Sequence, residues 1–365
     1  MNERNTGRTW IVTLAVTLAA VLAAFGIARL IHSFNSFRMG DFTTLPVSNV
    51  EYVQTVDESV VVYDGSTLNR FSSRGDSMWG DGVIIGQNYS VNANDHGVVL
   101  WKGNSFSVLR LSDHQNMYSN NLNADIVSAR LGSKYLAVLY GEDDNCKARI
   151  CDMDGRVQDE ISFESQVVVD FGFFSDGSLL WVMSMDTTGT VPTCTVTTYR
   201  LSRKSMMGSI SDGEQVIYHA QFEADNICLV GEEYIKRYDE VGNEMSDKRT
   251  LVYGWFLMDV SDGEKPMMVF VPDTQASNTP TISDVRLISG TQDQILRMPF
   301  PAHSVFAKGS TLYGFSGSNV MIGSIDSEVM TAYQLPMSVS DVAGVTDDNV
   351  AVIDSNNTYY LVALQ

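Results

Sequence analysis

The hydrophobic pattern divides the chain into two unlike parts. Residues 10–28 form an uncharged apolar stretch, WIVTLAVTLAAVLAAFGIA, whose 19 residues would span about 28 Å as an α-helix. From about residue 42 onward, short apolar runs alternate with polar turns, and no stretch keeps a helical period. The pattern therefore predicts one transmembrane helix followed by an all-β domain.

Eight apolar runs recur through the all-β part. Their length and their β-branched or aromatic content indicate buried strands rather than helices. Each run is followed by a turn and a second strand of mixed polarity. The runs are Ser59–Tyr63, Gly97–Trp101, Tyr135–Tyr140, Ser178–Met183, Asn226–Val230, Met267–Val271, Thr311–Phe315 and Asn349–Ile353.

Six of the strands that follow these runs share an arginine. It precedes an apolar residue and a polar turn, and successive copies are 40, 39, 51, 37 and 49 residues apart. The turns often carry Gly or Asp, which is typical of a hairpin between the third and fourth strands of a unit. A period near 40 residues with about four strands per unit is the signature of a β-propeller blade. The arginines are Arg70, Arg110, Arg149, Arg200, Arg237 and Arg286.

The number of blades follows from the length. Residues 42–365 divide into eight units of about 40 residues, whereas seven units of about 46 residues fit less well. The last unit, Asn349–Ile353 followed by Thr358–Ala363, ends without a fourth strand. The stretch Thr43–Gln54 can supply that strand, and closing the ring in this way removes exposed sheet edges. The sequence thus predicts a closed, all-β, eight-bladed β-propeller, with seven blades as the alternative.

Two resemblances accompany this pattern. The turn Phe174–Gly177 (FSDG) resembles the Phe-Ser-x-Asp-Gly turn of TolB-like and WD-type propellers, although it lacks the Pro common at the third position. The full layout resembles a family of Gram-positive bacterial proteins called domain of unknown function 5711, in strings such as Gly97–Leu111 and Ile235–Glu244. That resemblance covers nearly the whole chain. It implies a short cytoplasmic tail, one transmembrane helix and a propeller-like domain, with no known activity.

The N-terminal apolar stretch fits either a retained anchor or a cleaved signal peptide. Arg4, Arg8 and the free amine precede it, as they would in both cases, and Gly26–Ala28 loosely fits a cleavage site. The apolar run is longer than the roughly 7–15 residues usual for a signal peptide, which favours the anchor. We predict a cytoplasmic tail over residues 1–9, a transmembrane helix over Trp10–Ile31, a stalk over residues 32–41 and a propeller over residues 42–365.

Charge is distributed unevenly between these parts. The chain carries 24 basic and 44 acidic residues, a net charge of −20, which argues against a nucleic-acid partner. Residues 1–38 carry a net charge of +3, which suits an anionic membrane leaflet, whereas residues 39–365 carry −23. Basic residues flank the helix almost equally, and the free amine favours an N-terminus inside the cell. We therefore predict that the propeller lies outside the cytoplasmic membrane.

No pattern of histidines or acidic residues in the sequence indicates a catalytic site, a cofactor site or a metal site, and we predict none. The five histidines have no partner at the short spacings that metal sites use. The sequence Asp152–Gly155 begins like a calcium loop, with Asp143 and Asp144 nearby, but the distal glutamate of an EF-hand is not in place. A solvated hairpin turn is the favoured interpretation of this segment.

The four cysteines form no CxxC motif. Cys146 and Cys151 are five residues apart in one strand, so we expect their side chains on opposite faces. A disulfide between Cys151 and Cys194 fits an oxidising compartment. Free, buried thiols that act as small hydrophobic groups are the favoured interpretation.

Two repeated features allow a binding role as well as a structural one. The recurrent arginines fit either a ring of cations for an anionic polymer or pairs with acidic residues in adjacent strands, and pairing is favoured. Four tryptophans fit either a surface that stacks on carbohydrate or the packing of blades, and packing is favoured. They are Trp79, Trp101, Trp181 and Trp255.

The expected protein is a single-pass membrane protein that displays a non-enzymatic binding or scaffolding module at the cell envelope. Its expected ligand is a protein or a wall polymer. The fold alone does not establish this function, because propellers host many activities. The alternative is an envelope glycan hydrolase or lyase, which would need two carboxylates about 5–10 Å apart at one mouth of the central channel.

The topology can be tested with protease added to intact cells. Because residues 42–365 are predicted to lie outside the membrane, the protease should digest them. Immunoblotting of the propeller measures the result. Full protection of the propeller would contradict an exported domain.

Overall fold

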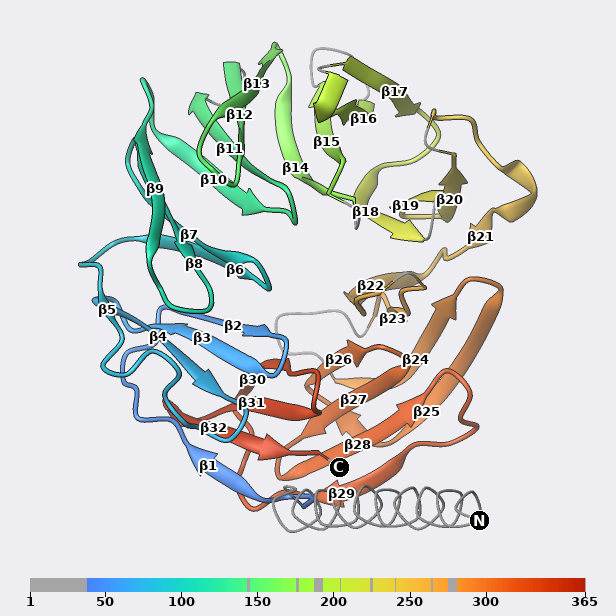
Figure 1. The fold of residues 1–365 in the computed structure, drawn as a ribbon. Coiled ribbons are helices and arrows are strands. Elements are labelled where there is room, and N and C mark those ends of the chain that lie inside the picture. The colour runs from blue at the N-terminus through green and yellow to red at the C-terminus, as the bar shows by residue number, and fades with distance from the viewer. Residues whose placement is uncertain are drawn as a thin grey trace, which may run out of the picture.

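The computed structural model describes most of the chain after residue 37. Within these residues, 32 strands and two short 3-10 helices, Leu201–Arg203 and Ser246–Lys248, are found. The strands form eight four-stranded antiparallel sheets arranged around a central axis, as Figure 1 shows. The described ranges are 38–142, 145–174, 177–186, 193–203, 205–223, 226–239, 241–263, 265–274 and 281–364.

Seven sheets, which we number blades 1 to 7, each take four consecutive strands, from the innermost to the outermost. Blade 1 holds β2 (Tyr52–Val56), β3 (Ser59–Tyr63), β4 (Thr67–Ser72) and β5 (Val83–Ile84). Blade 2 holds β6 (Ser90–Asn94), β7 (Gly97–Lys102), β8 (Ser105–Arg110) and β9 (Asn116–Asn121). Blade 3 holds β10 (Ile126–Leu131), β11 (Tyr135–Glu142), β12 (Asn145–Asp152) and β13 (Val157–Glu164).

The next four blades continue the same order. Blade 4 holds β14 (Val167–Phe173), β15 (Leu179–Asp186), β16 (Thr193–Arg200) and β17 (Ser205–Asp212). Blade 5 holds β18 (Ile217–Glu223), β19 (Asn226–Gly231), β20 (Tyr234–Tyr238) and β21 (Thr250–Leu251). Blade 6 holds β22 (Trp255–Val260), β23 (Met268–Pro272), β24 (Ile282–Ser289) and β25 (Gln292–Ala302). Blade 7 holds β26 (Ser304–Lys308), β27 (Thr311–Ser316), β28 (Asn319–Ser324) and β29 (Thr331–Gln334).

Blade 8 joins the two ends of the described chain. It holds β30 (Asp341–Val345), β31 (Val350–Ser355), β32 (Thr358–Ala363) and, as its outer strand, β1 (Phe42–Thr44). Thr43 lies opposite Leu361, and the Leu45 amide donates to the Tyr359 carbonyl at 2.9 Å. The prediction of a closed eight-bladed propeller is therefore confirmed. The closing strand is shorter than the predicted Thr43–Gln54, because Tyr52–Val56 already forms the inner strand of blade 1.

All eight apolar runs of the sequence correspond to the second strands of the blades. These strands are apolar on both faces because each face packs on a different neighbouring blade. In β3, Val61 and Tyr63 join a cluster with Val98 of blade 2. Val60 and Val62 of the same strand instead contact the core residues of blade 8. A fully buried side chain of this size contributes about 1.5–3 kcal/mol.

The arginines that recur in the sequence all lie on third strands, as the repeat predicts. Pairing with an adjacent strand is confirmed for Arg149 with Glu160, at 2.8 Å, and for Arg286 with Asp293, at 2.7 Å. It is wrong for Arg110, which instead pairs with Asp113 in the following turn. Each of these arginines therefore contacts a partner of its own close to its third strand, and the contacts differ from blade to blade.

The remaining two arginines with described contacts also depart from the predicted pairing. Arg237 pairs at 2.8 Å with Glu223 of the inner strand, two strands away. Arg70 donates to the Ser59 hydroxyl and to the Leu111 carbonyl of blade 2. Arginine can take such positions because its planar donor fork reaches several acceptors at once.

Within the part of the chain that the structure describes, no helix has the length and apolarity needed to cross a membrane. The predicted transmembrane helix Trp10–Ile31 lies outside the described residues.

The contact between blades 1 and 8 gives a stability prediction. Leu45 is 2% exposed and packs with Val60 of blade 1 and Leu361 of blade 8. The substitution Leu45→Ala should lower the free energy of unfolding by about 2–5 kcal/mol, because it leaves a cavity where the ring closes. Chemical denaturation measures the change.

Phe42→Ala is the matched control. Phe42 is half exposed on the same short stretch of chain, so its truncation should cost less than about 1.5 kcal/mol. If the two variants unfolded with the same free energy, the apolar packing at Leu45 would not be what holds the two blades together.

Candidate binding site at the mouth of the central channel

The inner strands of the blades surround the central channel, and several of them contain a β-bulge near their start. Register shifts occur between Ile126 and Ser128 in β10, and at the corresponding places in β14, β18, β22 and β30. A bulge re-aims the side chain that follows it. In three consecutive blades this side chain is titratable: Asp170, His219 and Asp259.

A cavity of about 440 Å³ lies in this part of the channel wall. It is built from the inner strands of four successive blades, β10, β14, β18 and β22, together with one residue of β15. The turn Ser261–Gly263, which follows β22, borders it, so the cavity lies near the channel mouth at the C-terminal ends of the inner strands. Its volume falls within the roughly 300–1,000 Å³ of small-ligand sites.

The floor of the cavity is aromatic. Trp181 belongs to the second strand β15, yet it lines the channel cavity because its partner on the inner strand, Gly172, has no side chain. A Cβ atom at residue 172 would lie 2.9 Å from three atoms of the indole ring. Phe222 of β18 lies next to Trp181, with ring centroids 5.9 Å apart, and against Phe174 at 3.8 Å.

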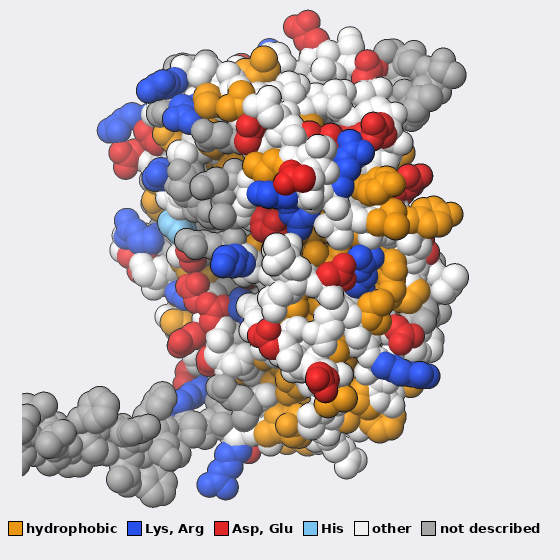
Figure 2. All heavy atoms as spheres, turned by 90° about the vertical axis from the view of Figure 1, so that its right-hand side faces the viewer, with side chains coloured by type: hydrophobic (Ala, Val, Ile, Leu, Met, Phe, Trp, Pro, Cys, Tyr) orange, Lys and Arg blue, Asp and Glu red, His pale blue; other side chains and the backbone are white. Residues whose placement is uncertain are grey.

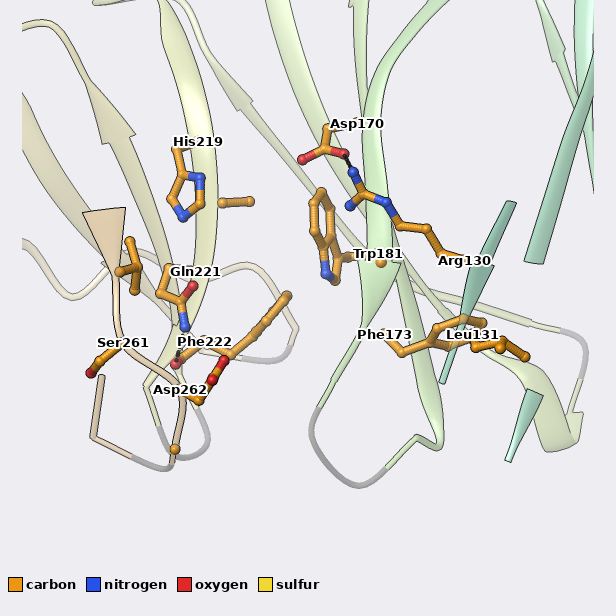
Figure 3. Close-up of a pocket in the computed structure, with 14 residues that line it drawn as sticks. Arg130, Leu131, Asp170, Phe173, Trp181, His219, Gln221, Phe222, Ser261 and Asp262 are labelled. Carbon is orange, nitrogen blue, oxygen red and sulfur yellow. Dashed lines mark hydrogen bonds and ion pairs between the residues drawn. The ribbon is translucent and has the colours of Figure 1, made fainter. Parts of the chain in front are cut away.

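One wall of the cavity carries an ion pair. Arg130 of β10 and Asp170 of β14 lie 2.8 Å apart, and Figure 3 shows them together beside Trp181. Arg130 also donates to the Phe171 carbonyl, and its guanidinium lies 5.3 Å from the centre of the Phe171 ring. The carboxylate thus balances the arginine charge, and the contact ties blade 3 to blade 4.

The opposite wall carries His219 and Gln221 of β18, which Figure 3 shows across the cavity from Arg130 and Asp170. The His219 Nε2 atom is buried and has no hydrogen-bond partner among the described residues. Burial lowers the pKa of His219, although an interaction with Gln221 and the charge of Asp170 act against this shift. The ring is therefore neutral at pH 7, and it has unused hydrogen-bonding capacity.

A second hollow of about 450 Å³ continues from the first. It shares His219, Gln221 and Val260 with the first cavity and extends to Tyr218 at the start of β18. Asp259 borders it, but the Asp259 carboxylate accepts a hydrogen bond from the Ala307 amide of blade 7 at 2.6 Å. Burial raises the pKa of Asp259.

Two carboxyl groups that border these hollows already have partners. Asp170 pairs with Arg130, and Asp259 accepts a hydrogen bond from the backbone of the next blade. Across the described residues, no group of three or more His, Cys, Asp or Glu side chains could hold a metal ion. The cavity instead offers aromatic faces and hydrogen-bonding groups to a ligand.

The four tryptophans all pack within or between blades, as the sequence favours, and Trp181 has a second position at the cavity. Trp79 is buried and donates its indole N–H to the Leu111 carbonyl, so it packs blade 1 against blade 2. Trp101 and Trp255 pack against separate apolar clusters. Trp181 packs in the core of blades 4 and 5 and also lines the channel cavity.

The four cysteines are buried, and none of them forms a disulfide. Cys146 and Cys151 belong to apolar clusters on opposite faces of β12, as their spacing predicts. The Cys151–Cys194 disulfide is not formed, and burial raises the pKa of the Cys151 thiol to about 11. Such thiols are protonated at neutral pH and act as apolar packing groups.

The calcium-like segment Asp152–Gly155 is a hairpin turn between β12 and β13. The Asp152 carboxylate accepts hydrogen bonds from the Asp154 and Arg156 amides and from Gln158. The turn itself therefore uses these oxygen atoms. The other proposed ligands, Asp143 and Asp144, lie outside the described residues.

The recurrent arginines do not form a ring of free cations, because those described above are engaged in local contacts. In blade 5, Arg237 is 5% exposed on its side chain, and Glu223 is 9% exposed. Glu223 also accepts a hydrogen bond from the Gly290 amide of blade 6. Breaking such a buried pair by removing one partner typically costs about 3–5 kcal/mol.

Sequence reasoning named two members of the cavity, His219 and Trp181, but it assigned both to structural roles. It missed Arg130, Asp170 and Gln221, which are polar residues in strands with no distinctive motif. The available signal was their position, since each lies on the first strand of its unit, ahead of an apolar run. That position can be recognised only after each strand has been assigned to its place in a blade.

The buried histidine gives a pH prediction. The folded-state pKa of His219 lies below the ordinary value of about 6.5, so the unfolded chain binds this proton more readily. Wild-type stability should therefore fall as pH drops from 7 towards 5, and His219→Gln should remove that part of the loss. Melting temperatures measured at pH 5, 6, 7 and 8 test this.

Above pH 7 the difference between the two proteins should stay constant, because the ring is neutral in both states. An equal loss of stability in both proteins between pH 7 and pH 5 would show that His219 is not the group responsible.

Comparisons with known proteins identify the fold. The computationally designed Ika8 protein is similar at a TM-score of 0.61 and 12% identity, over 87% of this chain and 98% of that chain. Saccharomyces cerevisiae Sqt1 is similar at a TM-score of 0.59 and 9% identity, over 89% of this chain and 98% of that chain. The C-terminal WD40 domain of Sif2 is similar at a TM-score of 0.59 and 11% identity, over 90% of this chain and 100% of that chain. No protein-family model and no curated protein matches the chain, so the resemblance to domain of unknown function 5711 stays a prediction. At these identities the likeness is one of fold: the chain is a WD40-like β-propeller.

Proposed function

We propose that this protein is a non-enzymatic binding or scaffolding module at the cell envelope, which takes its ligand at the channel-mouth cavity. The observation that carries the proposal is the cavity itself. Inner strands of three blades bring Arg130, Asp170, His219 and Gln221 around an aromatic floor, and β22 of a fourth blade borders it. A few convergent polar groups over apolar walls are the usual form of a ligand site.

The cellular location in this proposal rests on the amino-acid sequence. In this proposal the apolar stretch Trp10–Ile31 is a retained single-pass anchor, and the propeller lies outside the cytoplasmic membrane. The strong negative charge of residues 39–365 keeps the domain soluble and away from an anionic membrane surface. The ligand is a protein or an envelope polymer.

In the part of the chain that the structure describes, the side of the ring that carries β21 and β25 offers no surface of a single charge as a rival site. Figure 2 views the ring from the side where β21 and β25 lie in Figure 1, and acidic and basic side chains alternate over it. Several of these charges are paired, for example Arg249 with Glu244 and Arg286 with Asp293. No surface of a single charge forms there to select a polymer by electrostatics.

The proposal can be tested by affinity capture from envelope extracts with the full-length protein. Gln221→Leu keeps the side-chain volume but removes hydrogen-bonding groups from the cavity, so capture should fall by at least about tenfold. The amounts of captured protein and polymer are measured by mass spectrometry and sugar analysis.

Gln54→Leu is the matched control. Gln54 also lies on an inner strand, β2 of blade 1, and is exposed, but it does not line the cavity, so capture should be unchanged. Equal capture by wild type and both variants would place the binding surface elsewhere. Release of cleaved glycan by wild type, lost in Gln221→Leu, would instead favour the hydrolase or lyase.

A further inference from the structure

The two hollows of the channel wall form one path along β18. They share His219, Gln221 and Val260, and each has an aromatic lining residue at its far end. At one end lie Trp181 and Phe222. At the other end Tyr218 stacks on Phe256 of β22, with ring centroids 5.6 Å apart and an interplanar angle of 6°.

The length of this path exceeds that of a single small ring. Tyr218 and Phe222 are four residues apart on β18, which corresponds to at most about 13 Å because the strand bulges at Tyr218. Tyr218 packs towards blade 6 and Phe222 towards blade 4. Phe256 is 43% exposed, so its ring is accessible to a ligand that leaves the channel wall. Two aromatic contacts separated by polar groups fit a ligand with several similar units.

The charged groups along the path leave no unpaired cation among its described lining residues. Asp170 neutralises Arg130. Lys308 pairs with both Asp262 at the rim and Asp347. Asp259 adds a further carboxyl group at the second hollow. Burial lowers the pKa of His219, so this ring adds no positive charge at pH 7. An anionic ligand would meet Asp170 and Asp262 with no free cation to compensate them, whereas a neutral ligand can use every hydrogen-bonding group.

We propose that the channel wall along β18 binds a neutral oligosaccharide, with sugar rings on two aromatic platforms and hydroxyl groups bonded to His219, Gln221 and Asp170. One platform is Phe222, backed by the buried Trp181, and the other is the Tyr218–Phe256 pair. A pyranose ring presents an apolar C–H face and a rim of hydroxyl groups, which matches aromatic faces beside hydrogen-bonding side chains. The buried His219 Nε2 atom has no partner among the described residues, and it would gain one if the ring turned towards the ligand. The inference rests on the proposed function and names its ligand.

The experiment measures binding of defined sugars to the full-length protein in a detergent that contains no sugar. The probes are the β-1,4-linked tetrasaccharide and disaccharide of N-acetylglucosamine, and the corresponding oligomers of glucose. Isothermal titration calorimetry gives the affinity. At least one neutral tetrasaccharide should bind, and its disaccharide should bind about tenfold more weakly because it cannot reach both platforms.

Three variants locate the binding. Gln221→Leu should weaken both sugar lengths by about tenfold, because it removes central hydrogen bonds. Phe256→Ala should weaken the tetrasaccharide by about fivefold and leave the disaccharide unchanged. Tyr253→Ala is the matched control, since Tyr253 is a 73% exposed aromatic residue that lines neither hollow and lies outside the Tyr218–Phe256 pair. Melting curves establish that each variant is folded.

The outcomes separate this inference from the proposed function. If no neutral tetrasaccharide binds wild type, the inference is overturned, while capture of a protein or an anionic polymer that depends on Gln221 leaves the proposed function standing. If a tetrasaccharide binds wild type, Gln221→Leu and Phe256→Ala equally well, the sugar binds elsewhere and the inference is also overturned. If capture itself does not depend on Gln221, the proposed function fails.

Discussion

The structure depends on the burial of each second strand on both of its faces. In β3, for example, Val61 packs towards blade 2 while Val60 packs towards blade 8. A strand that is apolar on both faces cannot be stable in an isolated blade, because one face would be exposed to water. Each blade therefore needs two neighbours, and a ring is the arrangement that gives every blade both of them.

Closure of the ring follows from the same requirement. Blade 8 has only three strands from the C-terminal end of the chain, and β1 from the N-terminal side completes it. Leu45 then packs between blades 1 and 8. Polar contacts add to this packing, since Arg70 and Trp79 of blade 1 both donate to the Leu111 carbonyl of blade 2.

The closed ring also brings polar side chains from several blades to one channel. The inner strands face one another across the channel, so residues from separate blades meet there. The bulges in β14 and β18 re-aim Asp170 and His219, and Gly172 leaves room for Trp181 to line the channel. The residues that hold the blades together and those that form the cavity are therefore largely different, although Trp181 and Arg130 do both.

The sequence by itself determined the strand architecture, the eight-fold repeat and the exchange of a strand at closure. It did so because an apolar run of four to seven residues and its following turn are local features that recur with a fixed period. It could not determine the partners of individual arginines, such as Arg237 with Glu223, since these depend on which strands become neighbours. Only the tertiary structure decided the cavity. Arg130, Asp170 and Gln221 belong to three consecutive blades, and they come together only when these blades pack side by side around the axis.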